Sequence, residues 1–125
     1  MVMRRGYRPL EDLMAGEELD ITVSEQDGTA VVAVSGEIDV YTSPILQERL
    51  VEVIRDGSSS IVLDLSDVTF LDSTGLGVLI TGLKRCRSAG GDLSLVTAQA
   101  NVLKVLEITG LNDVFKVHET VEDAT

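Results

Sequence analysis

Residues 63 to 80 read "LDLSDVTFLDSTGLGVLI", and they give the clearest sign of the fold class. An aliphatic run leads into an acid, two hydroxyls and two glycines, and apolar residues then return at helical spacing. This order predicts a buried strand that passes through a short junction into a helix. Asp72 and Ser73 stand at the junction, where the functional side chains of α/β sheets commonly gather.

Upstream, the pattern is that of a β-hairpin. Apolar and polar residues alternate over 19–26, "LDITVSEQ", and 29–36, "TAVVAVSG", is more uniformly apolar. The first pattern predicts a half-buried strand and the second a more fully buried one. Asp27 and Gly28 between them are a strong hairpin turn signal.

Between the hairpin and the central stretch, residues 41–57, "YTSPILQERLVEVIRDG", combine the start and stop chemistry of a helix. Ser43 is the predicted cap, Pro44 suits the first helical position and Gly57 suits the end. The residues expected on its buried face are Leu46, Leu50, Val53 and Ile54.

The rest of the chain alternates strands and helices. The predicted elements are a strand at 59–66, a helix at 73–88, a strand at 92–97, a helix at 99–110, a short strand at 114–119 and a possible terminal turn. The residues expected on the inner face of the 73–88 helix are Leu76, Leu79, Ile80 and Leu83. Such alternation predicts an α/β fold with a partly parallel sheet. Its loops "GEIDVYTS" and "VTFLDSTG" follow strands and are acidic and rich in hydroxyls.

Length and composition restrict the function. A chain of 125 residues predicts one domain, with residues 1–18 as a flexible extension and 19–125 as the folded unit. The net charge of −11 argues against binding to nucleic acid or anionic membranes. One cysteine (Cys86) and one histidine (His118) provide neither an internal disulfide nor a metal site. Without a signal peptide or an apolar run long enough to span a membrane, we expect a cytoplasmic protein.

A serine at position 73 is compatible in principle with several chemistries, and the surrounding residues argue against three of them. A hydrolytic nucleophile needs a base and an oxyanion hole, but the motif is not G-x-S-x-G and the only histidine is distant in sequence. A nucleotide-binding loop would need a lysine and another glycine spacing, and Asp72 would repel the phosphate. A receiver-like phospho-aspartate at Asp64 is disfavoured, because receivers have an acidic pair early in the chain and a lysine late in it, and Asp64, Asp67 and Asp72 all lie in the wrong region.

Two simpler interpretations remain for the junction. Asp72 or Ser73 can cap the helix, a contribution typically worth about 1 kcal/mol. That explains the serine but not Gly75, Gly77 and Gly82, each of which weakens a helix by up to about 1 kcal/mol relative to alanine. The glycines indicate a close approach, either by the sheet or by the backbone of a partner. Alternatively Ser73 receives a phosphate, which the helix dipole would tolerate while a docking surface would not.

The segments "SGEIDVYTSPILQERL", "LDLSDVTFLDSTGLGVLI" and "ITGLNDVFKV" together resemble the STAS-domain anti-sigma factor antagonists of bacteria, most closely actinobacterial members. The similarity covers about residues 19 to 123. It implies a single STAS domain, a mixed β-sheet with an opening hairpin and with helices packed mainly on one side. It also implies a regulatory binding module that is not an enzyme.

The resemblance further implies a partner-switching cycle. The unphosphorylated antagonist binds an anti-sigma factor that is also a serine kinase, and thereby releases a sigma factor. The kinase uses ATP as its own substrate to phosphorylate Ser73, the complex separates, and a serine phosphatase restores the binding form. No cofactor is implied for the antagonist, which would be a monomer or weak dimer. The residues implied in partner binding are Asp39, Asp72, Ser73, Thr74, Gly75 and Leu76.

Asp39, Thr74 and the chain as a whole also have other interpretations. Asp39 could be a solvated loop acid or a cap for the helix at Pro44, and Thr74 a first-turn helix residue or a minor phosphoacceptor. The chain could instead be a STAS scaffold subunit of a stress-signalling or transporter-associated assembly. A serine hydrolase is the alternative from a different class.

Overall fold

The computed structural model describes residues 19–125, so the predicted flexible extension at 1–18 lies outside the described residues. Its elements in chain order are β1 (Asp20–Gln26), β2 (Thr29–Ile38), α2 (Ser43–Arg55), β3 (Ser60–Leu71), α3 (Ser73–Ser88), β4 (Asp92–Val96), α4 (Ala100–Thr109), a 3-10 turn (Leu111–Asp113), β5 (Val117–His118) and α5 (Val121–Ala124). The strands form one sheet in the order β1-β2-β3-β4-β5.

The sheet is mixed, as the sequence predicted. β1 pairs antiparallel with β2, whereas the β2–β3, β3–β4 and β4–β5 pairs are parallel. Asp27 and Gly28 both have positive φ, 52° and 83°, which is the geometry of a two-residue hairpin turn. The hairpin prediction is therefore confirmed, and the α/β fold with an opening hairpin is confirmed with it.

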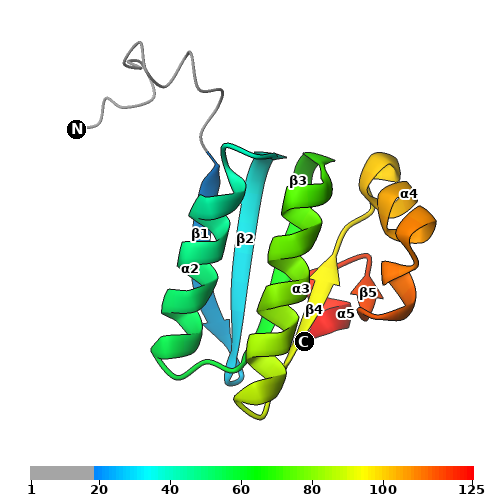
Figure 1. The fold of residues 1–125 in the computed structure, drawn as a ribbon. Coiled ribbons are helices and arrows are strands. Elements are labelled where there is room, and N and C mark those ends of the chain that lie inside the picture. Colours follow the sequence, from blue (N-terminus) through cyan, green and yellow to red (C-terminus); the bar gives the residue numbers. More distant parts are fainter. Residues whose placement is uncertain (1–18) are drawn as a thin grey trace, which may run out of the picture.

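The main core lies on one face of the sheet. Figure 1 shows α2 and α3 side by side in front of the strands, with α4 beside them. Leu46 and Leu50 of α2, Leu79 of α3 and Leu106 of α4 are buried in a single aliphatic cluster with the strands. The core is mainly aliphatic, with Phe115 as an aromatic member, because aromatic residues make up only 3% of the chain. The four-residue α5 is the exception and packs on a smaller cluster of Val31, Val62 and Val96.

Three local predictions need correction. Ser43 does not cap α2: it is the first helical residue and is buried, while Thr42 occupies the cap position without a side-chain cap bond. The strand predicted at 59–66 continues to Leu71, because shifts in the β2–β3 register interrupt the alternation that would have revealed it. The strand predicted at 114–119 shrinks to Val117–His118, since Val114 still belongs to the end of the 3-10 turn.

The predicted boundaries of α3 are confirmed, but its buried face is wider than predicted. Leu79 and Leu83 are buried as expected, whereas Leu76 and Ile80 are only half-buried. The other buried positions on this helix are Gly75, Val78, Gly82 and Cys86. Small residues allow α3 to lie close to the sheet, which fixes where its first turn stands.

Candidate functional site

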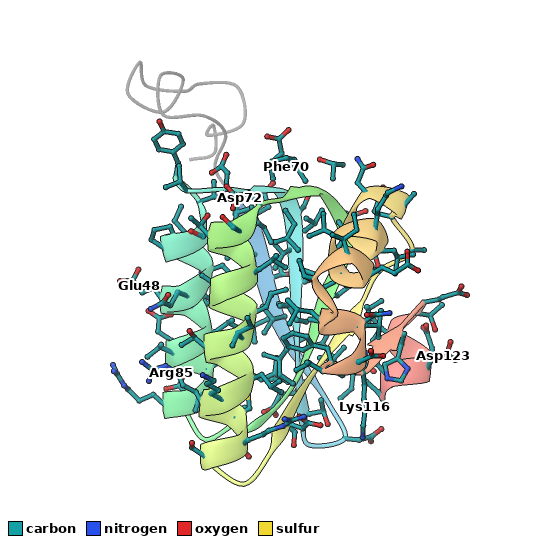
Figure 2. The ribbon with its side chains drawn as sticks, turned by 45° about the vertical axis from the view of Figure 1, so that its right-hand side comes forward. Glu48, Phe70, Asp72, Arg85, Lys116 and Asp123 are labelled. Carbon is teal, nitrogen blue, oxygen red and sulfur yellow. The ribbon has the colours of Figure 1, made fainter. Side chains whose placement is uncertain are left out.

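The two loops singled out from the sequence meet at one edge of the sheet. Ile38, the last residue of β2, pairs with Leu71, the last residue of β3. The Asp72 N–H donates to the Ile38 carbonyl oxygen at 3.2 Å, so the loops are joined directly after the strands end. Asp39 and Asp72 each follow one of these paired residues. Figure 2 shows Asp72 and Phe70 at this edge, at the beginning of α3.

Asp72 is the N-cap of α3. Its Oδ1 atom accepts hydrogen bonds from the Thr74 N–H at 3.0 Å, the Gly75 N–H at 3.1 Å and the Thr74 hydroxyl at 2.5 Å. Partial burial by itself would raise the pKa of Asp72, but these hydrogen bonds outweigh burial and lower the pKa below its ordinary value of 3.8. Of the two candidate caps, the carboxylate therefore takes the role, which leaves the serine free of it.

Ser73 is the first residue of α3 and is exposed. Within residues 19–125 no hydrogen bond involves its hydroxyl group, so the oxygen is accessible to a reacting group. The N–H groups of the first helical turn create positive potential at this end of α3. A phosphate on Ser73 would lie in that favourable potential, and the helix would not need to unwind to accept it.

Asp39 organises the loop before α2. Its Oδ1 atom accepts from the N–H groups of Tyr41 at 2.9 Å and Thr42 at 3.0 Å. The Thr42 hydroxyl in turn accepts from the Asp39 N–H at 2.9 Å and donates to the Glu37 carbonyl at 2.7 Å. Asp39 is thus more than a solvated acid, and its geometry is that of a local backbone-binding turn. Its part in partner binding stays a prediction.

The remaining predicted contact residues fall in different surroundings. Thr74 is exposed beside Ser73, and its hydroxyl donates to Asp72. Gly75 is buried, and a Cβ atom there would lie 2.5 Å from Leu71 Cδ1 and 2.6 Å from Ile38 Cγ2. Leu76 is half-buried against the core. The structure gives Gly75 a packing role, so contact with a partner stays a prediction for it and for Leu76.

Sequence reasoning missed an apolar feature of the same region. Val40, Tyr41, Ile45 and Phe70 are exposed large apolar residues from the loop after β2, the first turn of α2 and the end of β3. Tyr41 is 65% exposed and Val40 56% exposed. Exposed aromatic and aliphatic side chains beside polar ones are typical of protein-binding surfaces. The signal in the sequence was the apolar pair between Asp39 and Thr42, which helix capping does not require.

The geometry argues against hydrolysis by Ser73. His118 pairs with Val96, and Val96 pairs with Asp64 of β3. Asp64 lies seven residues before Leu71, which corresponds to roughly 20 Å along a strand. The histidine is therefore too far from Ser73 to act as its base, since a base must be within hydrogen-bonding distance.

None of the helices in residues 19–125 has the length and hydropathy required to cross a membrane. In the same residues no three His, Cys, Asp or Glu side chains are grouped closely enough to hold a metal ion.

Comparison with known proteins shows which family the chain belongs to. A family model for the STAS domain matches residues 20–124. The anti-sigma-B factor antagonist of Bacillus subtilis (strain 168) is 34% identical over 99 residues, which cover 79% of this chain and 90% of that protein. The chain belongs to the STAS-domain anti-sigma factor antagonists. The family recognised from the sequence motifs is thereby confirmed.

Other family members give the same result. The anti-sigma-B factor antagonist of Staphylococcus aureus (strain NCTC 8325 / PS 47) is 38% identical over 83% of this chain and 96% of its own length. An anti-sigma factor antagonist from Mycobacterium paratuberculosis superimposes with a TM-score of 0.78 at 34% identity, over 85% of this chain and 90% of that one. Antagonists of this family are regulatory binding proteins, so the prediction of a non-enzyme is confirmed and the serine hydrolase alternative is wrong.

Proposed function

We propose that the chain is a partner-switching antagonist whose unphosphorylated form binds an anti-sigma factor that is also a serine kinase. Binding releases a sigma factor for transcription in the cytoplasm. The kinase transfers the γ-phosphoryl group of ATP to the Ser73 hydroxyl oxygen, with loss of the hydroxyl proton, and ADP leaves. The phosphorylated antagonist then dissociates, and a serine phosphatase hydrolyses the phosphoester to restore the binding form.

The observation that carries this proposal is the environment of the Ser73 side chain. Its side chain is exposed, it stands beside a carboxylate that already caps the helix, and it lies at the same edge as four exposed apolar side chains. If the serine hydroxyl capped the helix, phosphorylation would remove that cap. Here Asp72 performs the capping, so the serine can be modified without loss of the cap.

The switch follows from the charge that a phosphate adds. A phosphoserine carries about −1.5 to −2 charges at pH 7. In the free antagonist that charge is solvated and is stabilised by the helix terminus. In a complex it would be desolvated beside the Asp72 carboxylate and the apolar side chains of Tyr41 and Phe70. A penalty of only about 2.7 kcal/mol would lower the affinity about a hundredfold.

The other predicted residues have supporting roles in this proposal. Asp72 fixes the orientation of the first turn, and Thr74 holds Asp72 in place through its hydroxyl. Asp39 holds the neighbouring loop, and with it the exposed side chains of Val40 and Tyr41, in one conformation. The apolar side chains supply docking area at the centre of the contact, where burial stabilises a complex most.

The experiment that tests the function is phosphosite mass spectrometry after incubation with ATP and a lysate of the source organism, with Ser73→Ala as the control. We expect phosphate on Ser73 in the wild type and none in the control. With the kinase purified, Ser73→Ala should stay bound in the presence of ATP, whereas Ser73→Asp should bind poorly. Full phosphorylation of Ser73→Ala would show that the acceptor is another residue. Absence of phosphate together with a stable large oligomer in size-exclusion chromatography would favour the scaffold alternative.

A further inference from the structure

Gly77 differs from the other glycines of α3 in having no packing reason within the described residues. A Cβ atom at Gly75 would meet Leu71 and Ile38, and one at Gly82 would lie 3.2 Å from side-chain atoms of Leu50 and Leu93. A Cβ atom at Gly77 would have no atom of the described part of the chain within 4 Å. The residue is exposed in the second turn of the helix, where glycine costs up to about 1 kcal/mol relative to alanine.

Gly77 lies in a groove between α2 and α3. The groove has a volume of about 750 Å³, with Val51 and Val78 among its apolar lining residues and with Glu48, Glu52 and Arg55 as its charged ones. Its lining runs along α2 from Ser43 to Arg55. The helix from Ser43 to Arg55 has 13 residues, so the groove extends over roughly 18 Å, or more than three helical turns.

The groove is continuous with the phosphoacceptor end of α3. Thr74 lines it, and Thr74 is also bonded to Asp72 beside Ser73. Pro44 of the first turn of α2 lines the opposite wall at this end. A partner that contacts Ser73 can therefore extend along the groove without leaving the surface.

The charge of the groove specifies the kind of partner. Glu52 forms an ion pair with Arg49 at 3.5 Å, whereas Glu48 has no ion pair within the described residues. Figure 2 shows the Glu48 side chain pointing outward from α2. Arg55 lines the far end of the groove, so Glu48 is the charge in its lining that a partner can pair with. The net charge of the chain is −11, so a basic surface fits at Glu48 and an acidic one is repelled.

We infer that the α2–α3 groove receives an α-helix of the anti-sigma factor, with Lys or Arg side chains directed at Glu48. The inference rests on the proposed function. Packing a helix into the space between two parallel helices is a common mode of recognition. The absence of a side chain at Gly77 allows the partner helix to approach α3 closely. Ser73 is next to Thr74 at one end of the same groove, so a phosphate there would have to be desolvated against the docked helix, and that cost would weaken its binding.

The test uses the full-length unphosphorylated protein and the purified kinase that phosphorylates Ser73. Gly77→Leu fills the groove, and its control Ala100→Leu adds a leucine at an exposed position of α4. Glu48→Lys reverses the charge of the wall, and its control Glu107→Lys makes the same change on α4. We expect each groove variant to bind at least tenfold more weakly than the wild type and each control to bind within twofold of it. The urea midpoint of Gly77→Leu should equal or exceed the wild-type value.

The outcomes separate the groove from the function. If the wild type binds and Gly77→Leu and Glu48→Lys both bind within twofold of it, the groove inference is wrong while the proposed function stands. If no kinase binds the wild type or modifies Ser73, the function fails and the inference fails with it. If Gly77→Leu is unfolded, the binding of Glu48→Lys still tests the groove inference, because this variant changes only an exposed side chain. If deleting residues 1–18 strengthens binding and Gly77→Leu abolishes that gain, the occupant is the chain's own N-terminal segment, and the partner helix is rejected.

Discussion

Replacing Gly75 by alanine should destabilise the protein, whereas replacing Gly77 by alanine, two residues further along α3, should stabilise it. At Gly75 the new Cβ atom would lie 2.5 Å from Leu71 Cδ1 and 2.6 Å from Ile38 Cγ2. Leu71 and Ile38 are buried, so neither can move away freely. Overpacking of this kind costs about 1–3 kcal/mol. At Gly77 the new atom has no neighbour within 4 Å among residues 19–125, and the helix gains up to about 1 kcal/mol.

The comparison of the two variants isolates the packing effect. Both substitutions gain helix propensity, so that contribution largely cancels in their difference, and about 1–3 kcal/mol of packing free energy remains. With a denaturant slope of roughly 2 kcal/mol per molar urea, the unfolding midpoints should differ by about 1 M. Circular dichroism at increasing urea concentration measures both midpoints under identical conditions.

A third variant serves as a graded control. Gly82→Ala would place Cβ 3.2 Å from Leu50 Cδ1 and Leu93 Cδ1, which are the flexible ends of leucine side chains. Its midpoint should fall between those of the other two variants. Equal midpoints for Gly75→Ala and Gly77→Ala, or a higher midpoint for Gly75→Ala, would refute the assignment of Gly75 to packing and of Gly77 to an open surface.

Two further predictions concern titratable groups. Because the folded-state pKa of Asp72 is lowered, its carboxylate contributes stability that is present above its ordinary pKa of 3.8 and is lost as the pH falls through the folded-state value. The difference in unfolding free energy between the wild type and Asp72→Asn should therefore shrink below about pH 4, and a difference that stayed constant down to pH 2 would contradict the capping geometry. Burial, with a smaller effect from the charge of Asp92, raises the pKa of the Cys86 thiol to about 11, and the side chain is fully buried. Iodoacetamide at pH 8 should accordingly leave Cys86 unmodified in the native protein and alkylate it in concentrated urea, whereas rapid labelling of the native protein would mean that α3 opens readily.

The sequence was sufficient for the order of the elements because the local signals agree with one another. Asp27 and Gly28 form the predicted turn, and α3 runs from Ser73 to Ser88 as its apolar spacing indicated. The errors occur where tertiary contacts override local preference. Thr42 and Asp39 occupy the start of α2 with a network of their own, so Ser43 is not needed as a cap. The irregular register of β2 against β3 hides the last residues of β3 from any test of alternation.

The position of the candidate site was predictable from the sequence, but the roles of its individual residues were not. The motif located Asp72 and Ser73 at a strand–helix junction, yet either residue could have capped the helix. Only the distances from Asp72 Oδ1 to the Thr74 and Gly75 N–H groups assign the cap to the carboxylate. The apolar side chains at this edge were not predicted, because Val40 and Tyr41 lie in a loop for which periodicity gives no information about exposure.

The glycines show most clearly what a sequence leaves open. All three weaken the helix by a similar amount, and the sequence therefore indicates a close approach without naming the approaching surface. The structure places Gly75 against the sheet and Gly82 against core leucines, which leaves Gly77 facing open space. A helix that keeps this destabilising residue with no contact in residues 19–125 to favour it is best explained by a contact with a surface beyond those residues. Because the groove at Gly77 begins beside Thr74, such a contact would be made and broken together with the contact at Ser73. One phosphate at the end of the groove could then control the whole interface.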